Sequence, residues 1–342
     1  MSQNNNNKTE KILIIGPSWV GDMVMAQSLF KVLVERYPGA TIDVMAPNWS
    51  KSLLERMPEV SGALEMPLGH GQLQIGLRKK LGRSLKSNAY TQAYVLPNSL
   101  KSALVPFFAK IPKRIGYIGE LRWGLLNDAR KLHKKQLTKT VQRFVALAME
   151  KGTVPTEWPY PRLEIDSNLV QTAVVKHQLT TERPILAICP GAEYGPAKRW
   201  PESHCAAVAK EKIQQGWQVW IFGSEKDQQV GQEIQQLTGE HCEDLTGKTS
   251  MAEALDLMSL AQVVVSNDSG LMHVAAALDK PVVALYGSSD PKFTPPLHDE
   301  AKILTLNLEC SPCFKRECPL GHLDCLNNLT PDMVLALLPD EA

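Results

Sequence analysis

The sequence lacks any apolar run that approaches the ~20 residues of a transmembrane helix. Its first residues also lack the charged-then-apolar layout of a secretory signal peptide. We therefore expect a cytoplasmic protein. Residues 1–10, which include the run Asn4–Asn7, are polar, and we expect them to form a disordered tail.

Two phosphate-binding motifs are missing as well. Neither half of the chain contains the pattern G-x-G-x-x-G or the pattern G-x4-G-K-[ST]. These glycine-rich loops hold the phosphates of dinucleotides in Rossmann folds and of nucleotides in P-loop enzymes. Their absence argues against a hydride-transfer enzyme and against a P-loop NTPase.

What the chain does have is an alternation of short apolar strands and helices. Its 342 residues, 44% hydrophobic and 21% charged, are enough for two globular domains. Strands are expected at 11–15, 41–45, 92–96, 184–189, 218–222, 262–266 and 281–286. Strands that alternate with helices predict parallel, doubly wound sheets. A proline-rich stretch at 152–161 divides a domain at 11–160 from a domain at 161–342.

The net charge of +1 conceals a strong asymmetry. Residues 1–143 hold 22 Lys and Arg against 9 Asp and Glu, whereas the rest of the chain holds 15 against 27. The stretch 78–143 alone has 16 basic and 2 acidic residues. This half should attract an anionic partner, such as a phosphorylated molecule, an anionic membrane surface or nucleic acid. The alternative is a solvated basic surface without a partner.

An acid follows the first expected strand. The apolar run Ile12–Ile15 leads into Gly16-Pro-Ser-Trp-Val-Gly-Asp22, and a helix is expected over 23–36. Open α/β sheets bind ligands at the carboxyl ends of their strands, so a carboxylate here can take a proton from a substrate hydroxyl. The segment fits equally well an acid that stabilises the N-terminus of the helix.

Two strand-end loops in the second half carry charged side chains. The loop 190–201 contains Lys198. This lysine either neutralises a phosphate or is, with Arg199, one of two adjacent cations on the surface. The loop 222–227 ends in Asp227, which either holds a ribose diol or stabilises a helix N-terminus.

A third strand-end loop, 266–273, leads into an alanine-rich helix. Asp268 or Ser269 can cap this helix, and the free N–H groups that follow suit a diphosphate. His273 lies one turn into the helix and either contacts phosphate or is a buried structural histidine.

Three segments together resemble the ADP-heptose–lipopolysaccharide heptosyltransferases. They are Gly16-Pro-Ser-Trp-Val-Gly-Asp-Met, Cys189-Pro-Gly-Ala-Glu-Tyr-Gly-Pro-Ala-Lys-Arg-Trp-Pro and Asn267-Asp-Ser-Gly-Leu-Met-His-Val-Ala-Ala-Ala-Leu. Together with Tyr94-Val-Leu-Pro-Asn-Ser, the first two resemble the branch that adds the second heptose more than the branch that adds the first. The resemblance runs from about residue 11 to the C-terminus. It implies the GT-B fold, in which two Rossmann-like domains face each other across a cleft.

The resemblance also implies roles for individual residues. Asp22 matches the general base of the family and Lys198 matches a lysine that holds the donor diphosphate, so these two are the catalytic candidates. The donor-binding candidates are Gly191, Lys198, Asp227, Asp268, Ser269, Gly270, Leu271 and His273. The acceptor-binding candidates are Gly21, Asn98, Ser99, Lys101, Arg114 and Arg122. The first domain would bind the acceptor, and the second would bind the donor.

The implied reaction is inverting transfer of L-glycero-D-manno-heptose from ADP-heptose to the first heptose of the lipopolysaccharide inner core. It requires neither a metal nor another cofactor. The acceptor, heptosyl-Kdo2-lipid A, is anionic, so binding it would account for the excess of basic residues in the stretch 78–143. We expect this stretch to face the acceptor and the anionic inner leaflet of the inner membrane, where the protein would be peripheral.

Four of the seven cysteines cluster as C-x2-C-x4-C-x6-C at Cys310, Cys313, Cys318 and Cys325. A structural zinc site, free thiols packed in a loop and redox chemistry are all open for this Cys-rich segment, 310–325. A disulfide is disfavoured in a cytosolic protein.

Two other classes of protein remain as alternatives. The first is a protein that binds nucleic acid or a membrane surface, built from the basic half and a cysteine-ligated metal. It predicts aromatic side chains interleaved with the basic stretch for base stacking, and it leaves the turn 267–273 unexplained. Another GT-B enzyme, such as a nucleotide-sugar epimerase, needs no lipid acceptor and therefore no basic domain. The sequence favours the transferase without nucleic acid as a partner.

Overall fold

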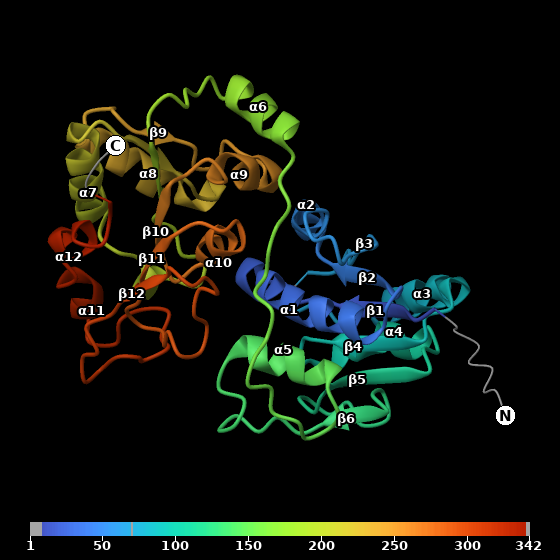
Figure 1. Ribbon diagram of the computed structural model, residues 1–342. Helices are drawn as coiled ribbons and strands as arrows, with labels where there is room; N and C mark the ends of the chain where they lie inside the picture. The colour runs from blue at the N-terminus through green and yellow to red at the C-terminus, as the bar shows by residue number, and fades with distance from the viewer. Residues whose placement is uncertain (1–8, 70, 340–342) are drawn as a thin grey trace. The chain divides into compact units, whose positions relative to one another are not determined.

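The computed structural model describes residues 9–69 and 71–339. The chain divides into two compact units, and the division falls between Pro161 and Arg162. Each unit is a parallel six-stranded sheet with helices (Figure 1). The expected α/β fold with two doubly wound sheets is therefore confirmed.

The first unit contains six strands in the order β3-β2-β1-β4-β5-β6. The strands are β1 (Lys11–Ile15), β2 (Thr41–Ala46), β3 (Gly62–Glu65), β4 (Gln92–Val95), β5 (Lys113–Tyr117) and β6 (Asp128–Arg130). Its helices are α1 (Val20–Arg36), η1 (Asn48–Ser50), α2 (Lys51–Leu54), α3 (Ile75–Ser84), η2 (Leu85–Asn88), η3 (Leu100–Ala103), α4 (Leu104–Phe108) and α5 (Thr140–Ala148). Helix α1 packs beside α5, and α3 packs beside α4 (Figure 1).

The second unit repeats this topology with the order β12-β11-β10-β7-β8-β9. The strands are β7 (Ile185–Cys189), β8 (Gln218–Ile221), β9 (Glu243–Asp244), β10 (Val263–Asn267), β11 (Val282–Leu285) and β12 (Lys302–Leu304). Its helices are α6 (Ser167–Lys176), η4 (Pro196–Lys198), α7 (Glu202–Gln214), η5 (Glu225–Asp227), α8 (Gln228–Leu237), α9 (Met251–Met258), α10 (Gly270–Ala277), α11 (Asp324–Asn327) and α12 (Pro331–Leu335).

The central strands are buried because helices cover both faces of each sheet. Residues Ile12–Ile15 of β1 and the whole of β7 are buried, which is why both strands are continuous apolar runs without alternation. In the second unit the core between the sheet and α7 is closed by Trp200 and by the C-terminal residues Leu329 and Val334. The apolar runs thus fix the central strands, from whose ends the candidate residues project.

Residues 1–8 of the expected disordered tail lie outside the described residues. Glu10, near its end, is placed, because its carboxylate accepts hydrogen bonds from the side chains of Thr91 and Gln92. Within residues 9–69 and 71–339, no helix is both long enough and apolar enough to cross a membrane.

Candidate functional site

The candidate residues of each unit gather where the strand order reverses. In the first sheet β1 pairs with both β2 and β4, and in the second β7 pairs with both β10 and β8. Chain connections leave such a pair of strands in opposite directions and open a crevice at the carboxyl ends, where α/β proteins bind ligands. Asp22 follows β1, and Lys198 follows β7.

In the second unit the structure brings Lys198 and Asp268 together. Lys198 Nζ lies 2.5 Å from Asp268 Oδ2, although 70 residues separate them in the sequence. Their side chains are 17% and 5% exposed, so the ion pair is largely shielded from water. Lys198 Nζ also lies 5.1 Å from the centre of the Tyr194 ring. Lys198 is therefore held at the crevice between β7 and β10. The alternative, in which Lys198 and Arg199 are simply two adjacent surface cations, does not fit this position.

Asn267, which the sequence interpretation did not single out, fastens the two loops that carry this ion pair. Its Nδ2 donates to the carbonyl of Pro190 at 2.6 Å, and its Oδ1 accepts from the N–H of Trp200 at 3.2 Å. The side chain is 1% exposed. A buried amide that uses both ends in this way fixes the loop after β7 against the end of β10.

Helix α10 presents an open N-terminus beside the ion pair. Ser269 is its N-cap residue, and the Ser269 side chain makes no capping hydrogen bond. The Ser269 hydroxyl instead lies 3.3 Å from the hydroxyl of Ser266, and the Asp268 carboxylate binds Lys198. The first N–H groups of the helix can therefore bind an anion, which the helix dipole favours.

His273 lies one turn into this helix and is buried. Burial lowers its pKa to about 4, while Asp268 acts to raise the pKa and Lys198 acts to lower it further. The imidazole is therefore neutral near pH 7, so it offers a hydrogen bond but no charge to a phosphate.

Asp227 lies at the end of the loop after β8. Its Oδ2 accepts from the N–H and the hydroxyl of Ser224 at 2.9 and 2.7 Å, which closes the turn. A Cβ on Gly191 would stand 2.5 Å from the Asp227 carboxylate, so glycine is needed where the two loops meet. Arg199 Nη2 lies 4.0 Å from Asp227 Oδ1. The structure thus brings Gly191 and Asp227 into contact.

Arg199 is more than the surface cation that the sequence suggested, and Ser288 and Ser289 are two further polar side chains that the sequence interpretation did not single out. The Nε of Arg199 and the hydroxyls of Ser288 and Ser289, in the loop after β11, are buried without a hydrogen-bond partner in the part of the chain that the structure describes. Buried polar groups are almost always paired, so such atoms are expected to meet a ligand or water. A serine pair after a strand is a weak sequence signal, which explains why it was missed.

In the first unit Asp22 is the third residue of α1, which begins three residues earlier than expected. A Cβ on Gly16, in the turn before it, would stand 2.7 Å from Met23 Cε, so the end of the Met23 side chain would have to move. Asp22 is half-buried, and neighbouring Gly21 is buried. Its position in the first helical turn favours the ionised carboxylate. Both the general base and the helix-terminal acid remain compatible with this position.

The loops after β4 and β5 are tied together next to β1. Asn98 is exposed, and its carbonyl accepts from the N–H of Glu120 at 3.2 Å. The Glu120 carboxylate accepts from the N–H of Leu100 at 2.8 Å. A Cβ on Gly119 would stand 2.1 Å from the Asn98 carbonyl oxygen, so only glycine fits. Ser99 and Lys101 are half-buried in the same loop.

Arg122 is a correction to the acceptor-binding prediction. Its side chain is 1% exposed, and its guanidinium donates to the carbonyls of Tyr117 and Pro97 at 2.9 and 2.7 Å and to the hydroxyl of Ser102 at 3.1 Å. It also donates to Asn98 Oδ1 at 3.4 Å. A guanidinium committed to these oxygens braces the loops and has no surface to offer an acceptor.

Arg114 is also used within the protein. Its Nε donates to the carbonyl of Leu125 at 2.7 Å, and its Nη1 donates to the carbonyl of Ile111 at 2.6 Å. Its guanidinium lies 5.7 Å from the centre of the Phe107 ring. These contacts tie the side chain to the segments that precede and follow β5. They favour a structural role over the predicted acceptor contact.

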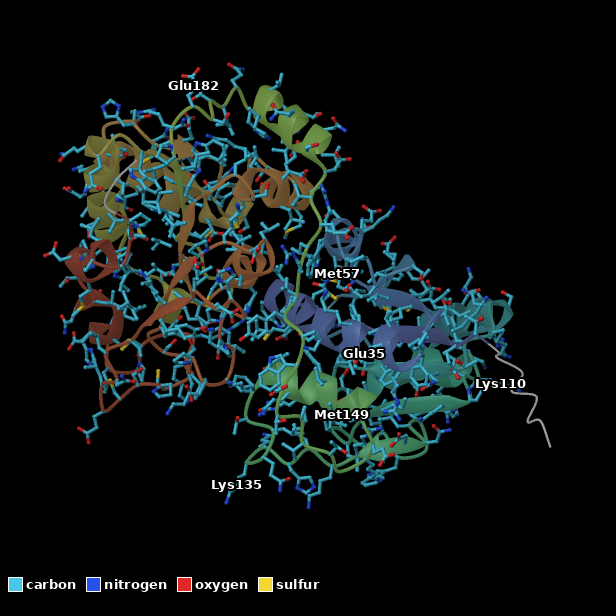
Figure 2. All side chains as sticks on the ribbon, viewed as in Figure 1. Glu35, Met57, Lys110, Lys135, Met149 and Glu182 are labelled. Atoms are coloured by element: carbon cyan, nitrogen blue, oxygen red, sulfur yellow. The ribbon has the colours of Figure 1, made fainter. Side chains whose placement is uncertain are left out.

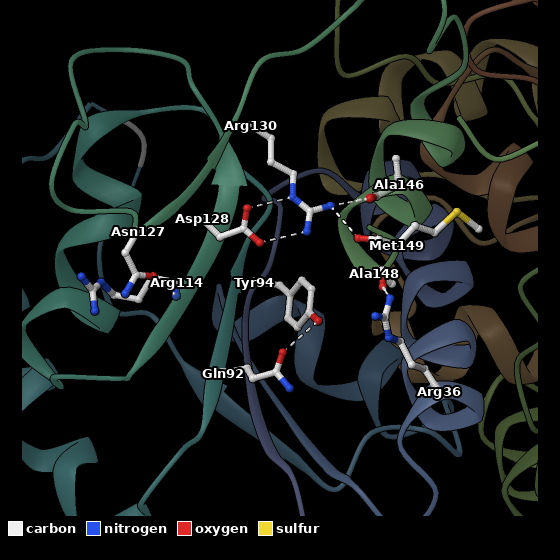
Figure 3. Close-up of polar contacts among 10 residues, drawn as sticks. All are labelled: Arg36, Gln92, Tyr94, Arg114, Asn127, Asp128, Arg130, Ala146, Ala148 and Met149. Atoms are coloured by element: carbon white, nitrogen blue, oxygen red, sulfur yellow. Dashed lines mark hydrogen bonds and ion pairs between the residues drawn. The ribbon is translucent and has the colours of Figure 1, made fainter. Parts of the chain in front are cut away.

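The basic stretch therefore divides its charges by residue type. Most of the arginines brace the fold, as Arg130 shows by donating to Asp128 and to the carbonyls of Ala146 and Met149 (Figure 3), whereas Arg83 is exposed. The lysines after β6 are exposed; they are Lys131, Lys134 and Lys135. Figure 2 shows Lys135 at the outer margin of the first unit. The charge available to a partner is thus carried mainly by lysine.

The Cys-rich segment packs against the loop that carries Lys198. The N–H of Ala197 donates to the carbonyl of Arg316 at 3.0 Å, and the hydroxyl of Tyr194 donates to the carbonyl of Phe314 at 2.9 Å. All four cysteines are free and line one small pocket. In the described ranges, no three His, Cys, Asp or Glu side chains are arranged to hold a metal ion.

Comparisons with known proteins agree on one family. The model of glycosyltransferase family 9 (heptosyltransferase) matches residues 78–324. The chain is 50% identical to lipopolysaccharide heptosyltransferase 2 of Salmonella typhimurium, over 95% of this chain and 96% of the relative. It is also 50% identical to lipooligosaccharide heptosyltransferase 2 of Haemophilus influenzae, over 96% and 98%. The solved structure of E. coli ADP-heptose LPS heptosyltransferase II matches with a TM-score of 0.86 at 47% identity, covering 96% of this chain and 97% of that one.

Proposed function

Because the chain belongs to glycosyltransferase family 9, the heptosyltransferases, we propose that it transfers L-glycero-D-manno-heptose from ADP-heptose to the first heptose of the lipopolysaccharide inner core. The observation that carries the proposal is the Lys198–Asp268 ion pair beside the open N-terminus of α10. This arrangement suits a nucleoside diphosphate, and relatives named for the second heptosyl transfer match over nearly their whole length.

The second unit supplies the proposed donor site. The diphosphate lies at the N-terminus of α10, where the N–H groups of Gly270 and Leu271 face it and Lys198 neutralises its charge. The other carboxylate oxygen of Asp227, Oδ1, lies 4.0 Å from Arg199 Nη2 and has lone pairs left to accept from a ribose hydroxyl. Gly191 keeps the loop after β7 close to this carboxylate.

The first unit supplies the proposed acceptor site. Gly21, Asn98, Ser99 and Lys101 lie at the carboxyl ends of β1 and β4, the side on which Asp22 also lies. The exposed lysines after β6 complement the phosphates and Kdo carboxylates of heptosyl-Kdo2-lipid A. Such an acceptor would bring the enzyme to the cytoplasmic face of the inner membrane.

The proposed chemistry is a direct displacement with inversion. Asp22 accepts the proton from a hydroxyl of the acceptor heptose, and that oxygen attacks the anomeric carbon of the donor. The bond from the anomeric carbon to the diphosphate breaks, and ADP leaves with its charge stabilised by Lys198 and by the helix N-terminus. These groups suffice for the reaction, so the mechanism uses no metal or cofactor.

The experiment that tests the proposed function is a transfer assay with two acceptors. ADP-heptose is supplied with Kdo2-lipid A that either carries or lacks the first heptose. We expect a product only with the heptosylated acceptor. Transfer directly to Kdo would assign the first heptosyl addition instead, and transfer to neither acceptor would contradict the proposal.

A further inference from the structure

The loop between β5 and β6 exposes two large apolar side chains. Leu121 is 80% exposed and Trp123 is 66% exposed. Arg122 between them is 1% exposed, so the three residues alternate out, in and out. Exposing a leucine and a tryptophan to water is unfavourable, and two such residues on one loop point to a partner.

The loop holds these side chains in place. The inward guanidinium of Arg122 binds the carbonyls of Tyr117 and Pro97. A short turn follows in which Gly124 has φ +79°, Trp123 forms a β-bridge with Leu126, and the N–H of Leu125 donates to the carbonyl of Arg122 at 3.2 Å. The apolar pair therefore stands on an anchored turn, which reduces the entropy lost when a partner binds.

Basic side chains follow the neighbouring strand, β6. Strand β5 pairs in parallel with β6, and the N–H of Ile118 donates to the carbonyl of Arg130 at 2.7 Å, so the loops after the two strands start side by side. The loop after β6 carries the exposed residues Lys131, Lys134 and Lys135, and residues 131–139 contain no acid. Residues 118–130 contain two acids, and both accept hydrogen bonds within the protein, Asp128 from Arg130 and Glu120 from the N–H of Leu100.

We propose that Leu121 and Trp123 insert into the interfacial layer of an anionic lipid bilayer while Lys131, Lys134 and Lys135 contact its headgroups. Tryptophan prefers this layer, and each nearby lysine adds attraction to anionic lipid. The surface lies at the carboxyl edge of the first sheet, on the side of Asp22. The inference rests on the proposed function, since an enzyme whose acceptor is anchored in a bilayer must bind at that bilayer to reach it.

Both the small area of this surface and its charge argue against a second copy of the chain as the occupant. Two exposed side chains bury far less than the ~1,200 Å² or more of a stable protein interface, and the three lysines would repel their counterparts across a two-fold axis. Anionic lipid is complementary to both parts of the surface.

Binding to vesicles tests the docking. The wild type should bind vesicles of phosphatidylethanolamine and phosphatidylglycerol, with a blue shift of tryptophan fluorescence, and should leave phosphatidylcholine vesicles unbound. The pair L121S/W123S and the triple K131E/K134E/K135E should each lower the affinity at least ~10-fold. Val175→Ser and Lys210→Glu, which change an exposed valine and an exposed lysine of the second unit, are the matched controls.

Activity on a soluble acceptor separates docking from catalysis. With a deacylated acceptor, L121S/W123S should keep the wild-type kcat/KM, because no bilayer is involved. A loss of kcat/KM there would make Trp123 an acceptor contact and overturn the proposal. Vesicle affinity that is absent in the wild type or unchanged in both variants would overturn it too, and so would dimerisation that the variants abolish. Failure of the proposed function itself would differ, since the wild type would then transfer heptose to no acceptor.

Discussion

At the scale of single residues, the ammonium group of Lys198 has its counter-ion within the protein, the carboxylate of Asp268. The pair is held between two loops that Asn267 fastens together. One Nζ donor of Lys198 is used by Asp268, and the lysine has two more to offer. A diphosphate at the N-terminus of α10 would therefore meet a positioned cation, so little rotamer entropy remains to be lost on binding.

Replacing Lys198 by alanine should weaken ADP binding by about 1.5–3 kcal/mol, because a charge-assisted contact is lost. Isothermal titration calorimetry with ADP measures the change. Lys226→Ala is the matched control, since Lys226 is a neighbouring lysine that pairs with Glu193 on the surface. Equal affinities of Lys198→Ala and wild type would return Lys198 to the class of surface cations.

Replacing Asp22 by asparagine should lower kcat at least ~10²-fold and leave the affinity for ADP unchanged. The amide keeps the size of the side chain but cannot accept the proton of the acceptor hydroxyl. Steady-state transfer kinetics and calorimetry separate the two effects. Glu35→Gln, at the other end of the same helix (Figure 2), controls for a loss of charge on α1. Near-normal turnover of Asp22→Asn would leave Asp22 as a helix-terminal acid only.

His273 should make the second unit less stable in mild acid. Its pKa is about 4 in the folded chain because of burial and about 6.5 when unfolded, so the unfolded chain binds more protons between these values. The free energy of unfolding therefore falls as the pH drops from 6.5 towards 4, by about 2 kcal/mol from pH 7 to pH 5. Urea unfolding of wild type and His273→Asn at both pH values measures this. An equally large fall in the variant would assign the acid sensitivity to other groups.

At the scale of elements, Arg122 links the loops that follow β4 and β5. Its replacement by alanine should lower the free energy of unfolding by about 2–4 kcal/mol, because buried carbonyls of Tyr117 and Pro97 lose their donors. Urea unfolding measures the loss, and Arg83→Ala, on the exposed side of α3, should change it by less than ~0.5 kcal/mol. A small effect of Arg122→Ala would mean that these loops hold without it.

The sequence predicts the central strands well because their burial leaves a local trace. Ile12–Ile15 and Ile185–Cys189 are apolar throughout, and both appear in the structure within a residue of the expected bounds. The edge strand Asp128–Arg130 has only three residues, two of them charged, and owes its conformation to pairing with β5. Such a strand leaves no local pattern and was missed.

The same distinction applies to the site. Lys198 and Asp268 were both singled out because each follows a strand, and topology alone then places them together. The role of Arg122 was mispredicted, because the destination of a long cationic side chain depends on which carbonyls the folded loops leave without donors. No pattern of residues in the sequence states that.

At the scale of the whole molecule, the two units share one topology but carry opposite net charges. Both sheets have the same strand order, but the first 143 residues carry an excess of basic side chains and the remainder an excess of acidic ones. Topology sets where each unit binds, and the charge sets what it attracts over distance. The basic excess that reaches solvent is mostly lysine, so its effect on a partner should be long-ranged and sensitive to salt.

Raising the salt concentration should therefore affect the two substrates unequally. Between 0.1 M and 1 M salt the Debye length falls from about 10 Å to about 3 Å, which screens exposed lysines far more than the shielded Lys198–Asp268 pair. With a deacylated acceptor, which excludes vesicle binding, the KM for the acceptor should rise at least ~5-fold and the KM for ADP-heptose less than ~2-fold. Kinetics with each substrate varied at both salt concentrations measure this. If both KM values rose equally, the basic surface would have no particular part in acceptor binding, and its charge would be a property of solubility alone.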